Sequence, residues 1–284
     1  MWTDESFEDY KLLDATGGER LERWGRFTLI RPDPQVIWGE PRRHPGWKAA
    51  DAAYTRSAAG GGSWSRHKLP ESWNIRWKNI AFKVKPTGFK HTGLFPEQAA
   101  NWTALDSLIK NAGRPLAVLN LFAYTGAATV VCAKAGAKVT HVDAAKGMVS
   151  WARENAALNG ADARWIVDDC AAFVEREARR GNVYDGIVMD PPSYGRGPNG
   201  KPWKLEDDLY PFLQKTVSLL SGEPRFFFLN AYTTGLAPSV LGYLLKTLIT
   251  PRFGGKAEAE ELGLRAEATG LAIPSGATGR WINL

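Results

Sequence analysis

From residue 87 onward, short apolar runs alternate with segments of helix length, and this alternation constrains the fold more than any other feature of the sequence. Apolar runs of this length suit strands that are buried on both faces of a sheet. Strands that alternate with helices predict a parallel sheet with right-handed crossovers. The expected strands are residues 116–121, 138–143, 163–167, 185–190 and 225–230, and the expected helices are residues 125–135, 144–158, 171–180 and 205–220.

The C-terminal segment departs from this alternation. Residues 262–267 and 280–283 flank the turn-forming group Pro274, Ser275 and Gly276. This pattern predicts an antiparallel hairpin at the edge of the sheet. Residues 87–284 are therefore expected to form an α/β domain with a mostly parallel, seven-stranded sheet that ends in an antiparallel hairpin.

The first 86 residues differ in composition from the rest of the chain. They contain seven of the twelve tryptophans, and they carry fifteen Lys and Arg against eleven Asp and Glu. Period-two runs such as residues 26–30 and 81–85, with Pro and Gly between them, predict short strands and turns. We therefore expect a small β-rich appendage over residues 1–86, with a possible part in substrate recognition.

The composition limits the classes of protein that the chain can belong to. Two cysteines, Cys132 and Cys170, and four histidines without zinc spacing argue against a disulfide scaffold and against a metal site. A net charge of +6 favours a polyanionic partner. The apolar residues 116–133 are interrupted by polar positions, and the acidic N-terminus is unlike a secretory signal, so no membrane segment and a cytoplasmic location are expected.

The end of the first expected strand has the features of a ligand loop. Residues 120–126 lead directly into a helix, where Gly126 allows a ligand to approach the backbone and the helix N-terminus offers free amides to a carboxylate. Gly126 is the only glycine in residues 116–135, so the G-x-G-x-x-G fingerprint of NAD or FAD is absent. An ordinary strand-to-helix turn is the alternative.

Carboxylates end the second and third expected strands. Asp143 is placed to accept hydrogen bonds from both hydroxyls of a ribose. Asp168 and Asp169 end the third strand, where one of them can face an adenine amino group, and the helix that follows makes Asp169 the better placed. Helix capping is the alternative role for these aspartates.

The fourth expected strand ends in the most specific motif of the chain, Asp190, Pro191, Pro192, Ser193 and Tyr194. Two prolines fix a rigid, extended turn without amide donors, which leaves carbonyls and the Asp190 carboxylate directed into the pocket. Tyr194 supplies a ring on which a flat base can stack. A plain Pro-Pro turn is the alternative.

In this order and spacing, these features resemble those of class I S-adenosylmethionine-dependent methyltransferases. More narrowly, residues 87–284 resemble the large-subunit ribosomal RNA cytosine-5 methyltransferase family. The resemblance implies a Rossmann-like fold, S-adenosyl-L-methionine as the cofactor with S-adenosyl-L-homocysteine as its product, and RNA, ribosomal RNA in particular, as the partner. It is carried by residues 90–98, 120–126, 143, 152–155, 158–159, 167–169 and 190–192.

The resemblance also implies roles for individual residues. Gly126 and its neighbours would hold the methionine end of the cofactor, Asp143 the ribose and Asp169 the adenine edge. A preceding segment would approach the cofactor through Lys90, Thr92 and Gln98. The expected cofactor-binding residues are Lys90, Thr92, Gln98, Asn120, Phe122, Tyr124, Thr125, Gly126, Asp143, Ala144, Asp168, Asp169, Cys170 and Asp190. The expected catalytic residues are Asp190, Pro191, Pro192 and Tyr194.

The chain departs from the family pattern in two places. Methylation at cytosine C5 needs a cysteine thiolate that adds to C6, and in the family this cysteine follows the fifth strand. Residues 228–234 contain no cysteine here, while Cys132 lies inside an expected helix and Cys170 follows the adenine-binding aspartate. We therefore expect methylation at an exocyclic amine rather than at C5. The second departure is that residues 1–86 contain no RNA-binding module that we can identify.

Several alternatives for the acceptor remain open. Asp190 and the Pro191 carbonyl can hydrogen-bond the protons of an exocyclic amine and stabilise developing positive charge, or Asp190 or Tyr194 can deprotonate a hydroxyl. Residues 195–204 carry three cations and a tryptophan, which suits a lid that meets RNA, or a solvated loop. The other functions considered are a small-molecule or protein methyltransferase, a non-catalytic RNA-binding module and a nicotinamide oxidoreductase.

Overall fold

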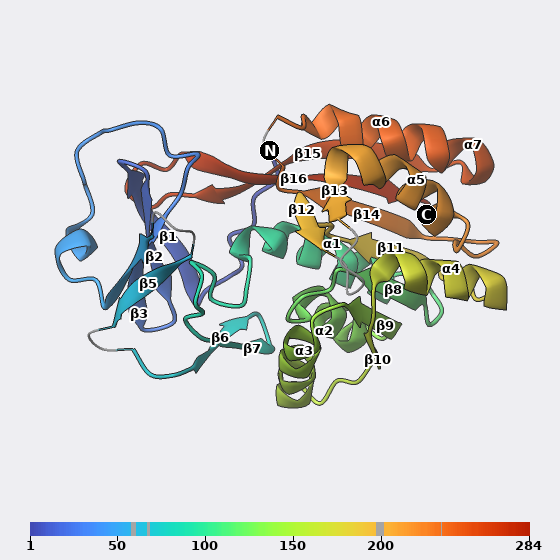
Figure 1. Cartoon of the computed structure of the whole chain (residues 1–284), viewed down its shortest axis with the longest axis horizontal. Coiled ribbons are helices and arrows are strands. Elements are labelled where there is room, and N and C mark those ends of the chain that lie inside the picture. The colour runs from blue at the N-terminus through green and yellow to red at the C-terminus, as the bar shows by residue number, and fades with distance from the viewer. Residues whose placement is uncertain (58–60, 67–68, 197–201, 234) are drawn as a thin grey trace. The chain divides into compact units, whose positions relative to one another are not determined.

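The computed structural model describes residues 1–284 except 58–60, 67–68, 197–201 and 234. The chain divides into two compact units, which we call unit 1 and unit 2. Unit 1 consists of Met1–Ala100 with Leu262–Ser275, and unit 2 consists of Asn101–Glu261 with Gly276–Leu284. The elements of both units are labelled in Figure 1.

Unit 2 is built on a seven-stranded sheet with the order β10-β9-β8-β11-β14-β16-β15. The first five strands in this order are parallel, and β16 is antiparallel to β14. The prediction of a mostly parallel α/β sheet with an antiparallel C-terminal strand pair is therefore confirmed. The strands are β8 (Ala117–Leu121), β9 (Lys138–Asp143), β10 (Arg164–Val167), β11 (Gly186–Met189), β14 (Phe226–Ala231), β15 (Lys256–Arg265) and β16 (Ala272–Ile282).

Helices cover both faces of this sheet (Figure 1). Because neighbouring side chains of a strand point to opposite faces, β14 sends Phe226 and Phe228 into one apolar core and Phe227 and Leu229 into the other. Burying one such side chain stabilises the fold by about 1.5–3 kcal/mol. One core packs on α1 (Ala99–Lys110) and α2 (Ala127–Lys134), with α3 (Lys146–Leu158) beside β9 and β10. The other core packs on α4 (Cys170–Arg180), α5 (Leu205–Val217) and α6 (Pro238–Leu248), and α6 leads into α7 (Thr250–Phe253).

The turn predicted within the C-terminal hairpin was wrong. Pro274, Ser275 and Gly276 lie inside β16, and the chain reverses between Arg265 and Ala272 instead. Gly270 supplies the positive φ (70°) of the actual turn, which glycine adopts without a steric penalty, and its amide donates to the Ala266 carbonyl at 2.8 Å. A single glycine, rather than the Pro-Ser-Gly group, therefore sets the position of this turn.

Two long helices of unit 2 were not predicted from the sequence. The segment of α1 has apolar residues Leu105, Leu108 and Ile109 at helical spacing, and α6 begins with Pro238 at its first turn. Both signals are typical of helices. None of the described helices is long and apolar enough to cross a bilayer.

Unit 1 is rich in β-structure, as predicted for the N-terminal appendage. A five-stranded sheet has the order β1-β2-β3-β4-β5, and β6 and β7 form a separate hairpin. Trp24 and Trp77 are fully buried, which places two of the N-terminal tryptophans in its core. The elements are β1 (Tyr10–Thr16), β2 (Glu19–Trp24), β3 (Phe27–Pro32), η1 (Pro45–Lys48), β4 (Ala52–Arg56), β5 (Gly62–Arg66), β6 (Trp73–Trp77), β7 (Ile80–Val84) and η2 (Pro96–Gln98).

Candidate active site

The turn between β8 and α2 is held in an unusual backbone conformation. Phe122 and Tyr124 have φ values of 54° and 51°, and Gly126 has a φ of 80°. Non-glycine residues rarely adopt positive φ, and those that do gather at functional sites. A Cβ atom on Gly126 would lie 2.7 Å from the Cβ of Ala152 in α3, so this position requires glycine for space as well as for conformation.

Side chains of α3, β8, α2 and β9 hold this turn in place through hydrogen bonds. The Asn155 amide of α3 donates to the Thr125 carbonyl at 2.8 Å. Asn120 donates to the Thr129 hydroxyl at 2.9 Å, and that hydroxyl lies 2.9 Å from His141 Nδ1. Burial, with the cation of Arg153 adding to it, lowers the pKa of His141 to about 3, so the ring is neutral at physiological pH.

Sequence reasoning missed three of these supporting residues, Asn155, Thr129 and His141. His141 is part of an apolar strand, and Asn155 and Thr129 lie inside helices. Each of the three has a polar side chain at a position where the hydrophobic pattern of its strand or helix predicts a buried residue. Such a position is the sequence feature that could have identified them. Their effect is to hold the Asn120–Gly126 segment in one conformation.

The Asp143 carboxylate connects the second strand end to this turn. Its Oδ2 accepts from the Tyr124 amide at 2.8 Å and its Oδ1 accepts from the Ala145 amide at 2.8 Å. Burial raises the pKa of Asp143 above its ordinary value, and the two hydrogen bonds oppose that shift. Each carboxylate oxygen has two acceptor sites, so this arrangement orients the group and leaves capacity for donors such as ribose hydroxyls.

Asp168 and Asp169 lie at the adjoining strand end. The Asp168 amide donates to the Asp143 carbonyl at 3.1 Å, so the second and third strand ends are neighbours. The Asp168 carboxylate forms an ion pair with Arg176 of α4. Asp169 is the N-cap of α4 and accepts from the Ala172 amide at 2.9 Å, so the capping role considered for this residue is present.

Both cysteines are buried. Cys132 lies within α2, faces the apolar core and is 1% exposed, and burial raises the pKa of its thiol to about 12. Cys170, at the start of α4, accepts from the Phe122 amide at 3.3 Å. Burial also raises the pKa of the Cys170 thiol well above its ordinary value. Neither sulfur is therefore a thiolate at neutral pH.

The proline turn follows β11 and is anchored at both ends. The Asp190 amide donates to the Leu121 carbonyl at 3.4 Å, and Trp203 donates to the Pro192 carbonyl at 2.6 Å. Tyr194 begins the short strand β12 (Tyr194–Arg196), which pairs with β13 (Pro202–Lys204). Tyr194 is 62% exposed, so its ring is accessible for stacking. Residues 197–201 of the predicted lid lie outside the described residues.

The predicted cofactor-binding residues fall in both units. The strand-end residues Asn120 to Gly126, Asp143, Asp168 to Cys170 and Asp190 belong to unit 2, where the sheet brings them to one edge. Lys90, Thr92 and Gln98 belong to unit 1. Thr92 is fully buried, and its hydroxyl has no hydrogen-bond partner among the described residues.

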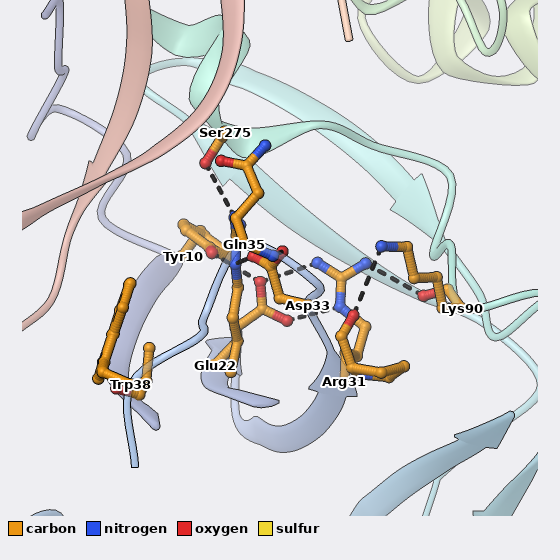
Figure 2. A network of polar contacts seen from close by, with 11 residues as sticks. Tyr10, Glu22, Arg31, Asp33, Gln35, Trp38, Lys90 and Ser275 are labelled. Carbon is orange, nitrogen blue, oxygen red and sulfur yellow. Dashed lines mark hydrogen bonds and ion pairs between the residues drawn. The ribbon is translucent and has the colours of Figure 1, made fainter. Parts of the chain in front are cut away.

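A buried network of charged groups in unit 1 holds the segment that carries Lys90 (Figure 2). Arg31 forms a two-point pair with Glu22, with Nη2 at 2.8 Å from Oε1, and Tyr10 donates to the same Oε1 at 2.8 Å. Arg31 also donates to the Lys90 carbonyl at 3.1 Å, and Lys90 Nζ donates to the Pro32 carbonyl at 3.4 Å. The sheet of unit 1 therefore fixes the backbone at Lys90.

The same network contains a second ion pair, between Arg20 and Asp33. Arg20 also donates to the Ser275 hydroxyl at 3.1 Å, which connects the two stretches of the chain that form unit 1 (Figure 2). Burial lowers the pKa of Lys90, and the nearby cation Arg31 adds to this shift. The network is thus buried, charged and connected to the Lys90 segment.

Residues 50–223 match the family model described as S-adenosylmethionine-dependent methyltransferase. The chain belongs to this family of S-adenosylmethionine-dependent methyltransferases. The prediction of a class I methyltransferase that uses S-adenosyl-L-methionine is confirmed, and the nicotinamide oxidoreductase alternative is excluded. Among the described residues of this methyltransferase, no group of three His, Cys, Asp or Glu side chains is arranged to hold a metal ion.

Sequence relatives of the methyltransferase include the Ribosomal RNA large subunit methyltransferase K/L of Shewanella frigidimarina, which is 34% identical over 154 residues. The protein of the same description from Pseudoalteromonas atlantica is 35% identical over 153 residues. Each alignment covers 52% of this chain and 21% of the relative. The matched region therefore spans about a fifth of the length of these relatives.

Solved structures extend the likeness to nearly the whole methyltransferase. The SAM dependent methyltransferase from Agrobacterium tumefaciens is 36% identical, with a TM-score of 0.93 that covers 99% of this chain and 92% of that one. SMU.776 complexed with SAH shares the fold, with 20% identity and a TM-score of 0.71 that covers 99% of this chain and 76% of that one. The full-length likeness includes the β-rich N-terminal residues as well as the α/β sheet.

Proposed function

We propose that this methyltransferase acts on RNA, ribosomal RNA in particular, and methylates a base at an exocyclic amine. The observation that carries the proposal is the Asp190 carboxylate directly after β11, followed by two prolines, at the same edge of the sheet as Asp143 and Asp168 and separated from the end of β9 by β8. The names of the sequence relatives support an RNA substrate, and so does the net charge of +6.

The strand ends of unit 2 fit the cofactor. The amino end of α2, which directly follows Gly126, offers free backbone amides that suit a carboxylate. In this proposal Asp143 binds the ribose hydroxyls, and Asp168 or Asp169 accepts from the adenine amino group. The remaining predicted neighbours of the cofactor are Asn120, Phe122, Tyr124, Thr125, Ala144 and Cys170, with Lys90, Thr92 and Gln98 from unit 1.

S-adenosyl-L-methionine supplies an electrophilic methyl group on a sulfonium. The protein mainly aligns the acceptor with this methyl group, because an in-line displacement depends on the approach geometry. Asp190 and the Pro191 carbonyl accept hydrogen bonds from the amine protons, which keeps the nitrogen lone pair out of conjugation with the ring. The nitrogen forms the new bond to the methyl carbon as the carbon–sulfur bond breaks, and Asp190 accepts the proton that the amine loses.

Cytosine C5 is disfavoured because its methylation requires a thiolate. Burial raises the pKa of both thiols, to about 12 for Cys132, so each is protonated at neutral pH. Cys132 faces the apolar core, and the Cys170 sulfur accepts a hydrogen bond from the Phe122 amide in the turn between β8 and α2. Neither arrangement suits a nucleophile that must reach C6 of a base.

The exposed Tyr194 ring and the β-rich N-terminal region supply the recognition of RNA in this proposal. Tyr194 stacks on the acceptor base next to Asp190. Residues 1–86 recognise the substrate, and residues 87–284 form the domain that binds the cofactor. Phosphate contacts from surface Lys and Arg would make RNA binding weaken as salt increases.

The test is mass spectrometry of ribosomal RNA nucleosides from cells with and without the gene. We expect one N-methylated nucleoside to be lost in the deletion strain and restored by the wild-type gene. The Asp190→Asn variant should still bind S-adenosyl-L-homocysteine but fail to restore the modification. Loss of 5-methylcytosine would refute the assignment to an amine, and an unchanged RNA profile would favour a small-molecule or protein substrate or a non-catalytic role.

A further inference from the structure

Asn230 lies beside Asp190 at the carboxyl edge of the sheet. The parallel strands β11 and β14 are in register from Gly186 with Phe226 to Met189 with Leu229, where β11 ends. Extending this register by one residue sets Asp190, which directly follows β11, opposite Asn230 of β14. Residues that are paired in parallel strands point to the same face. The acidic residue of the proline turn and Asn230 are therefore neighbours on one face of the sheet.

A chain of polar side chains fixes the orientation of Asn230. The Asn101 amide, in α1, donates to Asn230 Oδ1 at 2.9 Å and has a longer contact of 3.4 Å with the Thr278 hydroxyl. Arg280 Nε donates to Asn101 Oδ1 at 2.8 Å. The Arg280 guanidinium lies 5.3 Å from the centre of the Phe228 ring.

The direction of this chain follows from the chemistry of arginine. A guanidinium can only donate hydrogen bonds, so the atom of Asn101 that faces Arg280 must be its carbonyl oxygen. The Asn101 amide group then faces Asn230 and requires the Asn230 carbonyl oxygen as its acceptor. Burial lowers the pKa of Arg280 to about 10, which still leaves it charged at neutral pH.

This polarity leaves the Asn230 Nδ2 group for another partner. Asn230 is 2% exposed, and no described residue accepts a hydrogen bond from its Nδ2. A nearly buried amide donor without a protein acceptor is costly unless a ligand or water satisfies it. It lies next to Asp190, the group to which we assign the acceptor amine.

We infer that Asn230 is a specificity-determining residue whose Nδ2 donates to the ring nitrogen beside the amine that is methylated. This inference rests on the proposed function and deepens it. Asp190 accepts a hydrogen bond from the amine of the base, and Asn230 donates one to the neighbouring ring nitrogen. The two side chains together therefore recognise a base that has both groups. Adenine presents such a pair with N6 and N7, whereas uracil has no exocyclic amine. The substrate class is therefore an amino-bearing base.

Two variants test this inference without removing volume from the site. Asn230→Asp keeps the acceptor for Asn101 but has no outward donor. Asn101→Asp keeps the acceptor for Arg280 but cannot donate, so the Asn230 amide turns inward and its oxygen faces the substrate. Asn111→Asp, one residue after the end of α1, makes the same chemical change on the protein surface and serves as the control.

The assay is transfer of tritium from labelled S-adenosyl-L-methionine to total RNA from cells that lack the gene. We expect both site variants to lower kcat/KM for RNA by about 10- to 100-fold, because an unmatched buried polar group is strongly discriminated against. Their Kd for S-adenosyl-L-homocysteine should stay close to that of Asn111→Asp.

The outcomes distinguish failure of the role of Asn230 from failure of the proposed function. Wild-type rates in either site variant would overturn the role of Asn230, even if the protein methylates RNA. An equal loss of S-adenosyl-L-homocysteine affinity would also overturn it, because the network would then act on the cofactor site. If the wild-type protein transfers no label to RNA, the proposed function fails, and the role of Asn230 fails with it.

Discussion

Replacing Gly126 by alanine should destabilise the protein through a steric contact with Ala152, which a comparison with Gly181 can separate from the cost of the backbone conformation. Gly126 and Gly181 have nearly the same backbone conformation, with φ and ψ of 80° and 20° and of 68° and 19°. An alanine in this left-handed region costs about 1–2 kcal/mol. At Gly181 the new Cβ meets no atom within 4 Å, whereas at Gly126 it would lie 2.7 Å from Ala152 Cβ. Overpacking of this kind adds about 1–3 kcal/mol.

The free energy of unfolding should therefore fall by about 1–2 kcal/mol in Gly181→Ala and by about 2–5 kcal/mol in Gly126→Ala. Urea unfolding followed by tryptophan fluorescence measures both values, and calorimetry should show weaker S-adenosyl-L-homocysteine binding only for Gly126→Ala. Adding Ala152→Gly to Gly126→Ala should recover part of the loss in a double-mutant cycle. Equal destabilisation by the two alanines would refute the steric argument.

Three further predictions concern other residues. Burial raises the pKa of Asp143, so the affinity of the wild-type protein for S-adenosyl-L-homocysteine should decline as pH falls through a value above 3.8. Asp143→Asn should bind S-adenosyl-L-homocysteine about 10- to 100-fold more weakly and should lack this pH dependence. Calorimetry at several pH values measures both effects. Glu22→Gln should lower the free energy of unfolding by about 3–5 kcal/mol, because it leaves Arg31 buried without its carboxylate. The control Asp106→Asn breaks an exposed ion pair with Lys110 and should lower the free energy of unfolding by less than about 1 kcal/mol. Burial alone would raise the pKa of Glu22 but Arg31 lowers it overall, so the stability from this pair is present above pH 4.5 and is lost as pH falls through the lowered pKa. Tyr194→Ala should raise KM for RNA about 10- to 100-fold through lost stacking, while Tyr194→Phe and the exposed-site control Tyr243→Ala should leave it unchanged.

The parts of the fold that the sequence predicted are those that local patterns specify. The buried strands of unit 2 are short apolar runs, and Gly126, Asp143 and Asp190 each stand at or just after the end of such a run. Because parallel strands align their carboxyl ends, the order of the runs is enough to assign these positions to one edge of the sheet. The position of the C-terminal turn was missed because its only requirement is one left-handed residue, Gly270.

The residues that the sequence did not predict depend on contacts between distant segments. Asn101 and Asn230 are separated by 129 positions, and nothing near either residue indicates that their side chains meet. Arg31 and the Lys90 carbonyl are likewise 59 positions apart. Such contacts are fixed by tertiary packing, for which a single sequence contains no local signal.

Unit 1 is made from two separate stretches of the chain, and this discontinuity limits how the protein can be divided. Ala268 of the C-terminal stretch donates its amide to the Leu13 carbonyl at 2.9 Å, and Glu267 donates to the Leu12 carbonyl at 2.9 Å. A fragment that stops at residue 100 would lose these partners. The β-rich part therefore cannot be transplanted as an N-terminal module, and an exchange of parts between relatives must carry residues 262–275 along with the first hundred.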